Sequence, residues 1–189
     1  MIAGIVLAAG ASRRFGSQKL LASVGGVPLV RRTVARLLDA SLDEVVVVLG
    51  SDAAAVGAAL TGLRVRAVTN VAYATGMSSS LRAGVDALRP GTDAALVALA
   101  DQPGVGGEII DRLIDRYRAD RSAIVAPLYR GGLRGNPVLF DRSLFDELRA
   151  VSGDEGARSV VARDPGRVAL VEFAEEMPGD VDVPEDVDD

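Results

Sequence analysis

The amino-acid sequence predicts an α/β fold in three layers, with a mostly parallel, twisted sheet that carries helices on both faces. The first observation is that short apolar runs alternate along the chain with stretches whose apolar residues recur at helical spacing, a pattern typical of βαβ units. The second is that the 189 residues contain no Pro-, Gly- or Ser-rich linker, repeat or low-complexity tract. We therefore expect a single domain over residues 1–189.

Six apolar runs have the length and composition of buried strands. The first is rich in β-branched residues and ends at small ones. In chain order, the expected strands are Ile2–Ala8, Glu44–Leu49, Arg64–Thr69, Ala94–Ala100, Ala123–Ala126 and Val168–Phe173. A further apolar run follows the glycine-rich loop at 131–137, and we expect it to form a strand as well.

Helices are expected between these strands. In the first of them, Val30, Val34 and Leu37 recur at helical spacing and mark a buried face. In chain order, the expected helices are Leu29–Ala40, Ala53–Leu60, Ser79–Leu88, Gly107–Ala119, Arg142–Ala150 and Ala157–Ala162. Ligands of parallel α/β sheets gather at the carboxyl ends of the strands, so residues 7–10 and 99–101 are expected to border one site.

Composition limits the chemistry that is open to this chain. It has no Cys and no His, which excludes disulfides, thiolate and imidazole metal ligands, and histidine acid–base catalysis. The net charge of −5, without a basic tract, gives no support for nucleic-acid binding. No segment reaches the roughly 18 apolar residues of a membrane span, and the first residues do not resemble a signal peptide. We expect a cytoplasmic protein without membrane contact.

The loop after the first strand has the features of a nucleoside triphosphate site. Small residues at Ala8, Ala9 and Gly10 allow phosphate oxygens to approach the backbone amides closely. In the loop that follows, Arg14 and Lys19 supply positive charge for the phosphates. We therefore predict that Leu7, Ala8, Ala9 and Gly10 bind the nucleotide and that both cations act on its phosphates.

Two common phosphate-binding loops do not match this segment. A P-loop has four residues between its glycines and then Gly-Lys-Ser/Thr, whereas five residues separate Gly10 from Gly16 and Lys19 stands alone. The dinucleotide fingerprint needs Gly-x-Gly-x-x-Gly, which Gly10-Ala11-Ser12 does not supply. Asp52 follows the second strand like a ribose-binding acid, but the loop spacing argues against a dehydrogenase.

Residues Leu7–Leu21 instead match Leu-Ala-Ala-Gly-x-Ser-x-Arg-x-Gly-x-x-Lys-x-Leu. This segment resembles the signature of the MobA-like nucleotidyltransferases of molybdenum cofactor biosynthesis, most closely their cytidylyl branch, because Ala9 stands where the guanylyl branch has Gly. The resemblance implies a nucleotide-diphospho-sugar transferase-like, Rossmann-like fold and transfer of CMP from CTP to a phosphorylated acceptor. It also implies that the acceptor is the molybdenum-pterin cofactor and that a molybdoenzyme or a maturation chaperone is a partner.

Acidic residues offer ligands for Mg²⁺, the cofactor that the resemblance implies. Asp101 ends an apolar strand within Asp-Gln-Pro, and a hard carboxylate oxygen beside a phosphate loop suits Mg²⁺. The family resemblance gives Asp101 this role and gives a tail acid, Asp180 or next Asp182, the role of second ligand. Asp is also common at turns and helix caps, and the acidic tail is alternatively a solvated terminus, in which Val183 replaces the Thr usual in the family.

Three further segments resemble family motifs. The run Gly-Met-Ser-Ser-Ser-Leu contains Ser79 and Ser80, which we assign to nucleotide binding, although one serine is expected as a helix N-cap. Asn136 stands where the family commonly has His, and Arg158 is a candidate contact for the anionic acceptor. Asp154 is expected to cap the helix that begins near Gly156, and turn and cap roles would account for these last segments equally well.

Other functions stay open at this point. A related transferase that uses GTP or another phosphorylated acceptor is the nearest alternative. A non-catalytic regulator that binds CTP belongs to a different class, but a pure sensor has no need of both Lys19 and Asp101. An NAD-dependent dehydrogenase is a distant third.

Overall fold

The computed structural model describes residues 1–12 and 15–182. Its main sheet has the strand order β10-β7-β9-β6-β1-β4-β5, with β8 paired to β7. The strands are β1 (Ile2–Ala8), β4 (Glu44–Leu49), β5 (Arg66–Thr69), β6 (Ala94–Leu99), β7 (Ile124–Tyr129), β8 (Leu133–Arg134), β9 (Val138–Asp141) and β10 (Val168–Glu172). The pairs β1–β4, β1–β6, β4–β5 and β7–β10 are parallel, whereas β9 runs antiparallel to both β6 and β7. The expectation of a mostly parallel sheet is confirmed.

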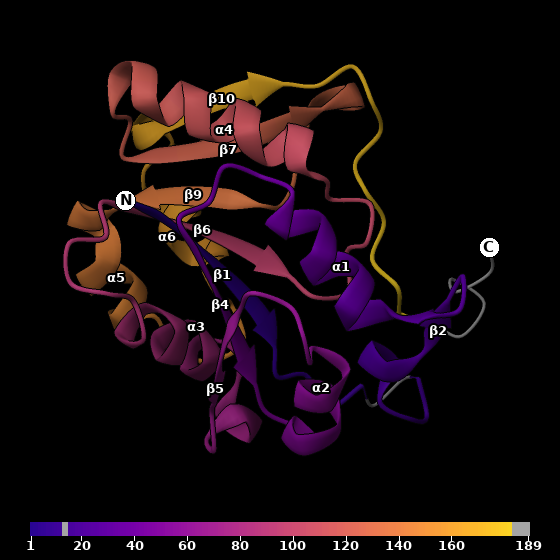
Figure 1. The fold of residues 1–189 in the computed structure, drawn as a ribbon. Coiled ribbons are helices and arrows are strands. Elements are labelled where there is room, and N and C mark those ends of the chain that lie inside the picture. The colour runs from indigo at the N-terminus through magenta and orange to yellow at the C-terminus, as the bar shows by residue number, and fades with distance from the viewer. Residues whose placement is uncertain (13–14, 183–189) are drawn as a thin grey trace.

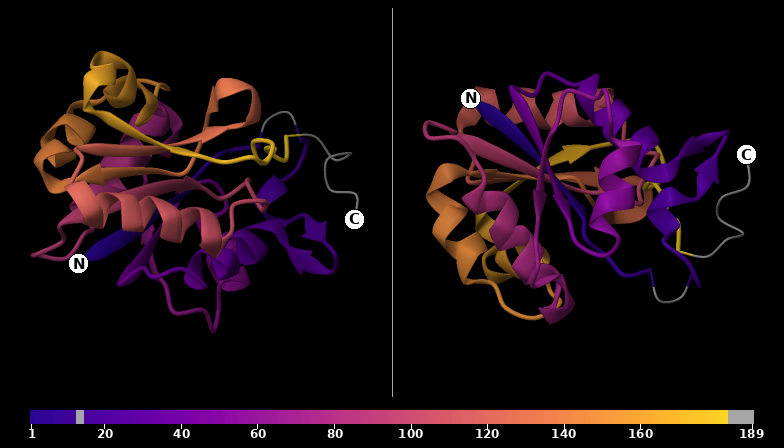
Figure 2. Two further views of the ribbon diagram at one scale, coloured as in Figure 1. Left: turned by 90° about the horizontal axis from the view of Figure 1, so that it is seen from above. Right: turned by 60° about the horizontal axis from the view of Figure 1, so that its bottom comes forward.

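Helices cover both faces of this sheet, as expected for three layers (Figure 1). The helices are α1 (Leu29–Leu38), α2 (Ala53–Ala59), α3 (Met77–Asp86), α4 (Gly107–Asp120), α5 (Phe145–Ala150) and α6 (Arg158–Arg163). Seen from above, α4 lies on one side of the sheet and α5 and α6 lie on the other (Figure 2, left). Among the described residues no helix is both long and apolar enough to cross a membrane.

The apolar side chains form two cores, one on each face of the sheet. On one face, α1 and α4 bury residues at helical spacing, among them Val34, Leu37 and Ile114, against Val6 and Val47 of the sheet. The other core is built by α3, α5 and α6, and its buried members are Ile5, Val48, Leu81, Val85, Ala95, Val97, Ile124, Ala126, Val138, Phe140, Leu144, Leu148, Val151 and Val160. Successive strand residues point to opposite faces, so both faces of β1 are buried, as its continuous apolar run predicts.

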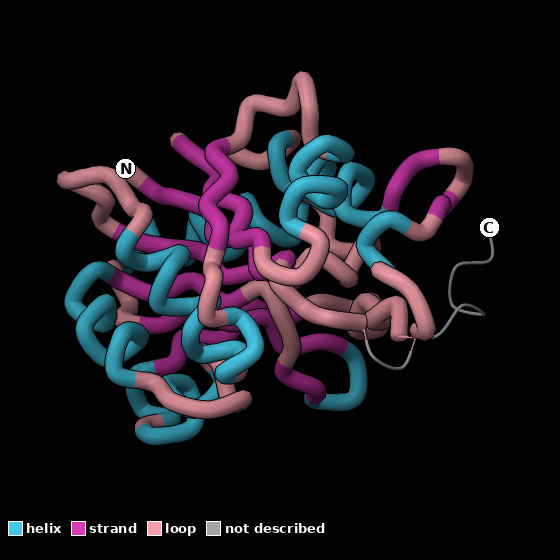
Figure 3. The backbone as a smooth tube through the Cα atoms, turned by 90° about the horizontal axis from the view of Figure 1, so that it is seen from below, coloured by secondary structure: helices cyan, strands magenta, loops and turns pink. Residues whose placement is uncertain are grey.

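Some element boundaries differ from the sequence-based expectations. Helix α3 begins at Met77 rather than Ser79, and β7 continues to Tyr129, beyond the expected end at Ala126. A short hairpin of β2 (Ser23–Val24) and β3 (Val27–Pro28) was not predicted, because two-residue strands carry no periodic signal. The hairpin stands away from the main sheet (Figure 3).

Candidate nucleotide site

The carboxyl ends of β1 and β6 meet at one edge of the sheet, as predicted. The two strands are neighbours in parallel register, with Leu7 paired to Leu99. A cleft of about 480 Å³ opens at this edge. Its lining residues are Leu7, Ala9, Gly10, Ala11, Ser12, Lys19, Leu20, Tyr73, Ala74, Gly76, Met77, Ser80, Leu99, Asp101 and Asp154.

Polar side chains link the described residues at the two ends of the segment between Gly10 and Lys19. The Gln18 amide donates to the carbonyl oxygens of Gly10 (3.2 Å) and Ser51 (3.3 Å). The Ser12 hydroxyl donates to Gln18 Oε1 (2.9 Å) and accepts from the Lys19 backbone amide (3.1 Å). The sequence pattern does not reveal Gln18, because a polar residue in a loop gives no signal of its partners. Arg14, predicted to contact the phosphates, lies outside the described residues.

A close backbone approach fixes the floor of the cleft. A Cβ on Gly50 would lie 2.6 Å from Ala9 Cβ and 2.7 Å from Tyr73 Cβ, so only glycine fits there. At Gly10 the opposite holds, because no atom of the other described residues, its two chain neighbours aside, lies within 4 Å of where its Cβ would be. The backbone at Gly10 is therefore open to a ligand.

The cation of Lys19 lies between two of the predicted metal ligands. Its Nζ is 2.6 Å from Asp101 Oδ2 and 3.1 Å from Asp182 Oδ1. The Lys19 side chain is only 14% exposed. Burial by itself lowers the pKa of Lys19, but hydrogen bonds and charges from Asp101 and Asp182 outweigh it and raise that pKa above the usual value. Lys19 is therefore an ammonium ion at neutral pH.

The C-terminal segment reaches the same site. The Val181 amide donates to the Asp101 carbonyl oxygen (2.9 Å), and the Val181 side chain is buried. The side chain of Asp180 turns to Gln102, whose Nε2 lies 2.5 Å from Asp180 Oδ1. Of the two predicted tail acids, Asp182 is therefore the one beside Lys19 and Asp101, although the family resemblance favoured Asp180.

Two buried oxygen atoms at the end of β6 have no hydrogen-bond partner among the described residues. They are Asp101 Oδ1 and Gln102 Oε1. Buried acceptors without a partner are unusual and call for an explanation such as an ion. Within the described residues no group of three or more His, Cys, Asp or Glu side chains forms a ready metal cage. The oxygen donors nonetheless fit a hard divalent cation that is also held by phosphates.

The predicted serines lie in the first turn of α3, not before it. No serine caps the helix, because Gly76 occupies the N-cap position. Asp154, expected to cap the helix near Gly156, instead accepts a bond from the Met77 amide (3.3 Å) at the start of α3. The loop around Asp154 packs so tightly there that a Cβ on Gly76 would lie 2.6 Å from the Gly153 carbonyl oxygen.

Asn136 and Arg158 are not among the residues that line the cleft. The Asn136 carbonyl oxygen accepts a hydrogen bond from the Tyr129 hydroxyl (2.9 Å), and the Asn136–Pro137 peptide bond is cis. Arg158 is exposed at the start of α6.

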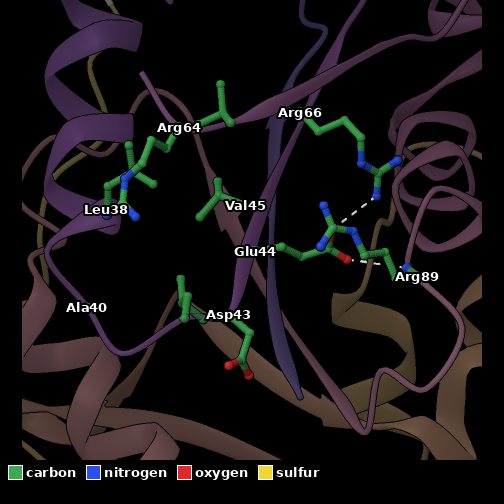
Figure 4. A pocket seen from close by; sticks show the side chains of 10 residues that line it. Leu38, Ala40, Asp43, Glu44, Val45, Arg64, Arg66 and Arg89 are labelled. Atoms are coloured by element: carbon green, nitrogen blue, oxygen red, sulfur yellow. Dashed lines mark hydrogen bonds and ion pairs between the residues drawn. The ribbon is translucent and has the colours of Figure 1, made fainter. Parts of the chain in front are cut away.

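A second hollow, of about 330 Å³, lies at the opposite ends of the strands, beside the start of β4 (Figure 4). One acid in its lining pairs with two arginines, because Glu44 Oε2 lies 3.3 Å from Arg66 Nη2 and 3.2 Å from Arg89 Nε. Glu44 also accepts the Arg89 backbone amide, and its side chain is 6% exposed. This cluster ties β4, β5 and the turn after α3 together.

Comparison with known proteins identifies the family. Residues 4–168 match the MobA-like NTP transferase domain. The chain belongs to this family. The family-level resemblance and the nucleotide-diphospho-sugar transferase-like fold are therefore confirmed.

Individual relatives have different names. The chain is 37% identical to a protein named nicotine blue oxidoreductase from Paenarthrobacter nicotinovorans, over 97% of this chain and 93% of that protein. It is 25% identical to a probable molybdenum cofactor guanylyltransferase of Thermococcus sibiricus, over 68% of this chain and 63% of that protein. The crystal structure of Rv0371c from Mycobacterium tuberculosis H37Rv superposes with a TM-score of 0.84 at 33% identity, covering 98% of this chain and 94% of that one. Rv0371c has also been solved as a complex with manganese, which superposes with a TM-score of 0.81 at 31% identity, covering 98% and 95%.

Proposed function

We propose that this member of the MobA-like family is a metal-dependent nucleotidyltransferase that moves CMP from CTP to a phosphorylated acceptor and releases pyrophosphate. The observation that carries the proposal is the contact of Lys19 with Asp101 and Asp182 at the edge of the sheet where the open backbone of Gly10 lies. A cation, carboxylates and free backbone are the three elements that a metal-bound triphosphate requires.

The triphosphate would lie along the loop from Leu7 to Lys19. Backbone amides of Ala8, Ala9 and Gly10 would contact its oxygens, and Lys19 would neutralise their charge. We assign the same role to Arg14 from the sequence alone. The tight packing of Gly50 against Ala9 supports the placement of the triphosphate over the Ala8–Gly10 backbone, because it fixes the backbone that a ligand would meet.

The metal would be held by Asp101, with Asp182 as the second acid and Asp180 as a further candidate ligand. Support comes from the buried Asp101 Oδ1, which has no partner among the described residues, and from the manganese complex of Rv0371c. We propose Mg²⁺ as the physiological ion, with Mn²⁺ as a substitute. A bound divalent ion would stabilise charge that develops on the phosphates and would orient them for attack.

The reaction requires no side-chain base. An oxygen of the acceptor's terminal phosphate, already ionised near neutral pH, would form a bond to the α-phosphorus of CTP. The bond from the α-phosphorus to the bridging oxygen would break, and pyrophosphate would leave with the electron pair. The protein must align the groups and stabilise negative charge, so the absence of His and Cys is no obstacle.

The proposal also covers the identity of the nucleotide base and of the acceptor. Ala9, where the guanylyl branch has Gly, supports CTP, whereas relatives named guanylyltransferase support GTP at least as well. We propose the molybdenum-pterin cofactor as acceptor and a molybdoenzyme or maturation chaperone as recipient. Asn136 and Arg158 are proposed contacts of the acceptor, and Ser79 and Ser80 of the nucleotide.

A second candidate function comes from one relative. The protein from Paenarthrobacter nicotinovorans, 37% identical over nearly the whole chain, is named an oxidoreductase. A nicotinamide dinucleotide also carries phosphates and a ribose, and the same loop would bind them. The loop spacing that argues against a dinucleotide fingerprint leaves this function second.

The experiment that separates these functions is thermal stabilisation by CTP, GTP, UTP, ATP and NADH, each with and without Mg²⁺ or Mn²⁺. A ligand that binds the native state raises Tm to an extent that grows with its affinity. Metal-dependent stabilisation by CTP, followed by pyrophosphate release with a phosphorylated pterin acceptor, would support the proposal. Selective stabilisation by GTP would move the protein to the guanylyl branch. Stabilisation by NADH alone would favour the oxidoreductase.

A further inference from the structure

Asn70 is a buried polar residue to which the sequence pattern gives no role. It follows the carboxyl end of β5, and only 7% of its surface is exposed. Its backbone amide donates to the Leu49 carbonyl oxygen (2.8 Å), so it continues the alignment of β5 with β4. Its side chain hydrogen-bonds to the first turn of α3, which borders the cleft.

The orientation of the Asn70 amide is fixed by its neighbours. Oδ1 accepts from the backbone amide of Ala72 (2.9 Å), which can only donate. The Nδ2 group therefore faces the serines and donates to Ser79 Oγ (2.8 Å) and Ser80 Oγ (3.0 Å). Both hydrogens of Nδ2 are used, so both serine oxygens act as acceptors toward Asn70.

The two serines differ in where their own hydrogens go. The Ser79 hydroxyl has two backbone acceptors, the carbonyl oxygens of Gly76 (2.9 Å) and Ala72 (3.0 Å). The Ser80 hydroxyl has no acceptor among the described residues, although Ser80 is only 4% exposed. Ser80 lines the cleft, together with Ala9, Tyr73 and Met77. A buried donor without an acceptor costs stability unless a ligand or water completes the bond.

We propose that Asn70 is a positioning residue that fixes the Ser80 hydroxyl as a hydrogen-bond donor toward an acceptor atom of the nucleotide base. The inference rests on the proposed function, because it takes the cleft as the nucleotide site. A pyrimidine carbonyl oxygen or a ring nitrogen satisfies the donor. An amino group at that position does not, because two donors would then face each other.

The carboxylate variant Asn70→Asp reverses this arrangement at nearly constant shape. In this variant one carboxylate oxygen would still accept from the Ala72 amide, but the second oxygen would accept the Ser80 hydrogen. Ser80 would then turn a lone pair toward the base. Asn70→Ala, by contrast, releases the Ser80 hydroxyl to rotate and leaves the Ala72 amide without its partner.

The test is a double-mutant cycle on Asn70 and Ser80, with affinities for CTP and GTP measured by calorimetry in the presence of Mn²⁺. For the better of these two ligands, Asn70→Asp is expected to weaken binding about tenfold, since an acceptor would face an acceptor. In the Ser80→Ala background the same change should weaken binding less than about twofold, which also measures the effect of the added charge. Thr75→Val, which removes a hydroxyl that donates to the Ala72 carbonyl oxygen (2.8 Å) outside the cleft lining, serves as the control and should leave affinity unchanged.

A second readout separates positioning from folding. Asn70→Ala should unfold at a lower temperature than Asn70→Asp and yet bind the nucleotide more tightly. The less stable of the two variants is thus expected to be the better binder. The positioning role of Asn70 would be overturned if Asn70→Asp weakened binding equally with and without Ser80, or if the more stable variant also bound more tightly. Either result would leave the proposed function standing. Failure of the unmodified protein to bind either triphosphate would overturn the proposed function and this inference with it.

Discussion

Lys19 and Asp101 are separated by 82 positions in the chain, yet their charged atoms lie 2.6 Å apart. Both side chains are partly shielded from water, at 14% and 21% exposure. An ion pair in this setting interacts more strongly than one on the surface. Their contact ties the segment after β1 to the end of β6.

Replacing either member of this pair is expected to stop nucleotidyl transfer. For Lys19→Ala and for Asp101→Ala we expect the rate of pyrophosphate release to fall by at least about a hundredfold, because each removes charge stabilisation at the phosphates. Asp146→Asn, on a side chain that is 97% exposed on α5, is the control and should retain full activity. Near-normal turnover by the Asp101 variant, with an unchanged circular dichroism spectrum, would remove Asp101 from the metal site.

Tyr129 provides a pH-dependent test of the structure. Burial raises the pKa of its hydroxyl to about 12, from an ordinary value of 10.0, so the unfolded chain ionises first as the pH rises. The contribution to stability is complete below pH 10 and is lost between about pH 10 and 12, at about 1.4 kcal/mol per unit. Chemical denaturation at pH 9, 10, 11 and 12 should therefore show that the free energy of unfolding of the unmodified protein falls relative to that of Tyr129→Phe across this window. A constant difference between the two proteins would contradict the buried state of the hydroxyl.

The residue types of the site could be predicted from the sequence, but their partners could not. Lys19 and Asp101 stand out because charged residues end or follow apolar strands at predictable edges. The choice between Asp180 and Asp182 depends on how the tail turns at Val181, which no local pattern encodes. Asn70 and Gln18 were missed for the same reason, since their roles arise only from tertiary hydrogen bonds.

Helix α3 contacts the sheet through a glycine that has no room for a side chain. A Cβ on Gly84 would lie 2.5 Å from Ile5 Cγ2 and 3.2 Å from Val48 Cγ2. Glycine is normally unfavourable inside a helix by about 1 kcal/mol relative to alanine. Its presence here is explained by the close approach of α3 to β1 and β4.

Gly84→Ala should therefore destabilise the protein despite the better helix propensity of alanine. Overpacking in a core costs about 1–3 kcal/mol, which outweighs the gain in propensity in most of that range. Gly57→Ala on α2 is the matched control, because its Cβ would meet only the end of the Leu49 side chain, at 3.3 Å. Urea denaturation should show a loss for Gly84→Ala and no loss for Gly57→Ala, and equal behaviour of the two would contradict the close packing of α3.

At the level of elements, the long periodic segments were predictable and the short ones were not. The six main strands of the parallel sheet and all six helices lie where apolar runs and helical spacing indicate, with shifted ends. The direction of β9 has no local signal, because an apolar run of four residues fits either orientation. The hairpin of β2 and β3 is likewise too short to show alternation.

For the whole molecule, the sheet consists of two parallel groups of strands joined by one reversed strand. Among the described strands, β7 and β10 reach the rest of the sheet only through β9, which pairs with β6 on its other side. The centre of β9 is fully buried, with Leu139 in one core and Phe140 in the other. Every apolar contact on β9 therefore helps to join the two groups.

Because β9 connects the two parallel groups of strands, its detachment would leave β7 and β10 without their connection to β6. The three strands β7, β9 and β10 are therefore expected to open as one cooperative unit. Native-state hydrogen exchange should give the amides of β7 and β10 a common opening free energy, separate from that of β1 and β4. Leu139→Ala, which removes a buried side chain at a typical cost of about 2–5 kcal/mol, should lower that opening energy in all three strands together. Independent changes in β7 and β10 would argue against a shared unit.

The order of assembly follows from the same geometry: the strands β1, β4, β5 and β6 can pair as soon as they are synthesised, whereas β7 must wait for a strand that comes later in the chain.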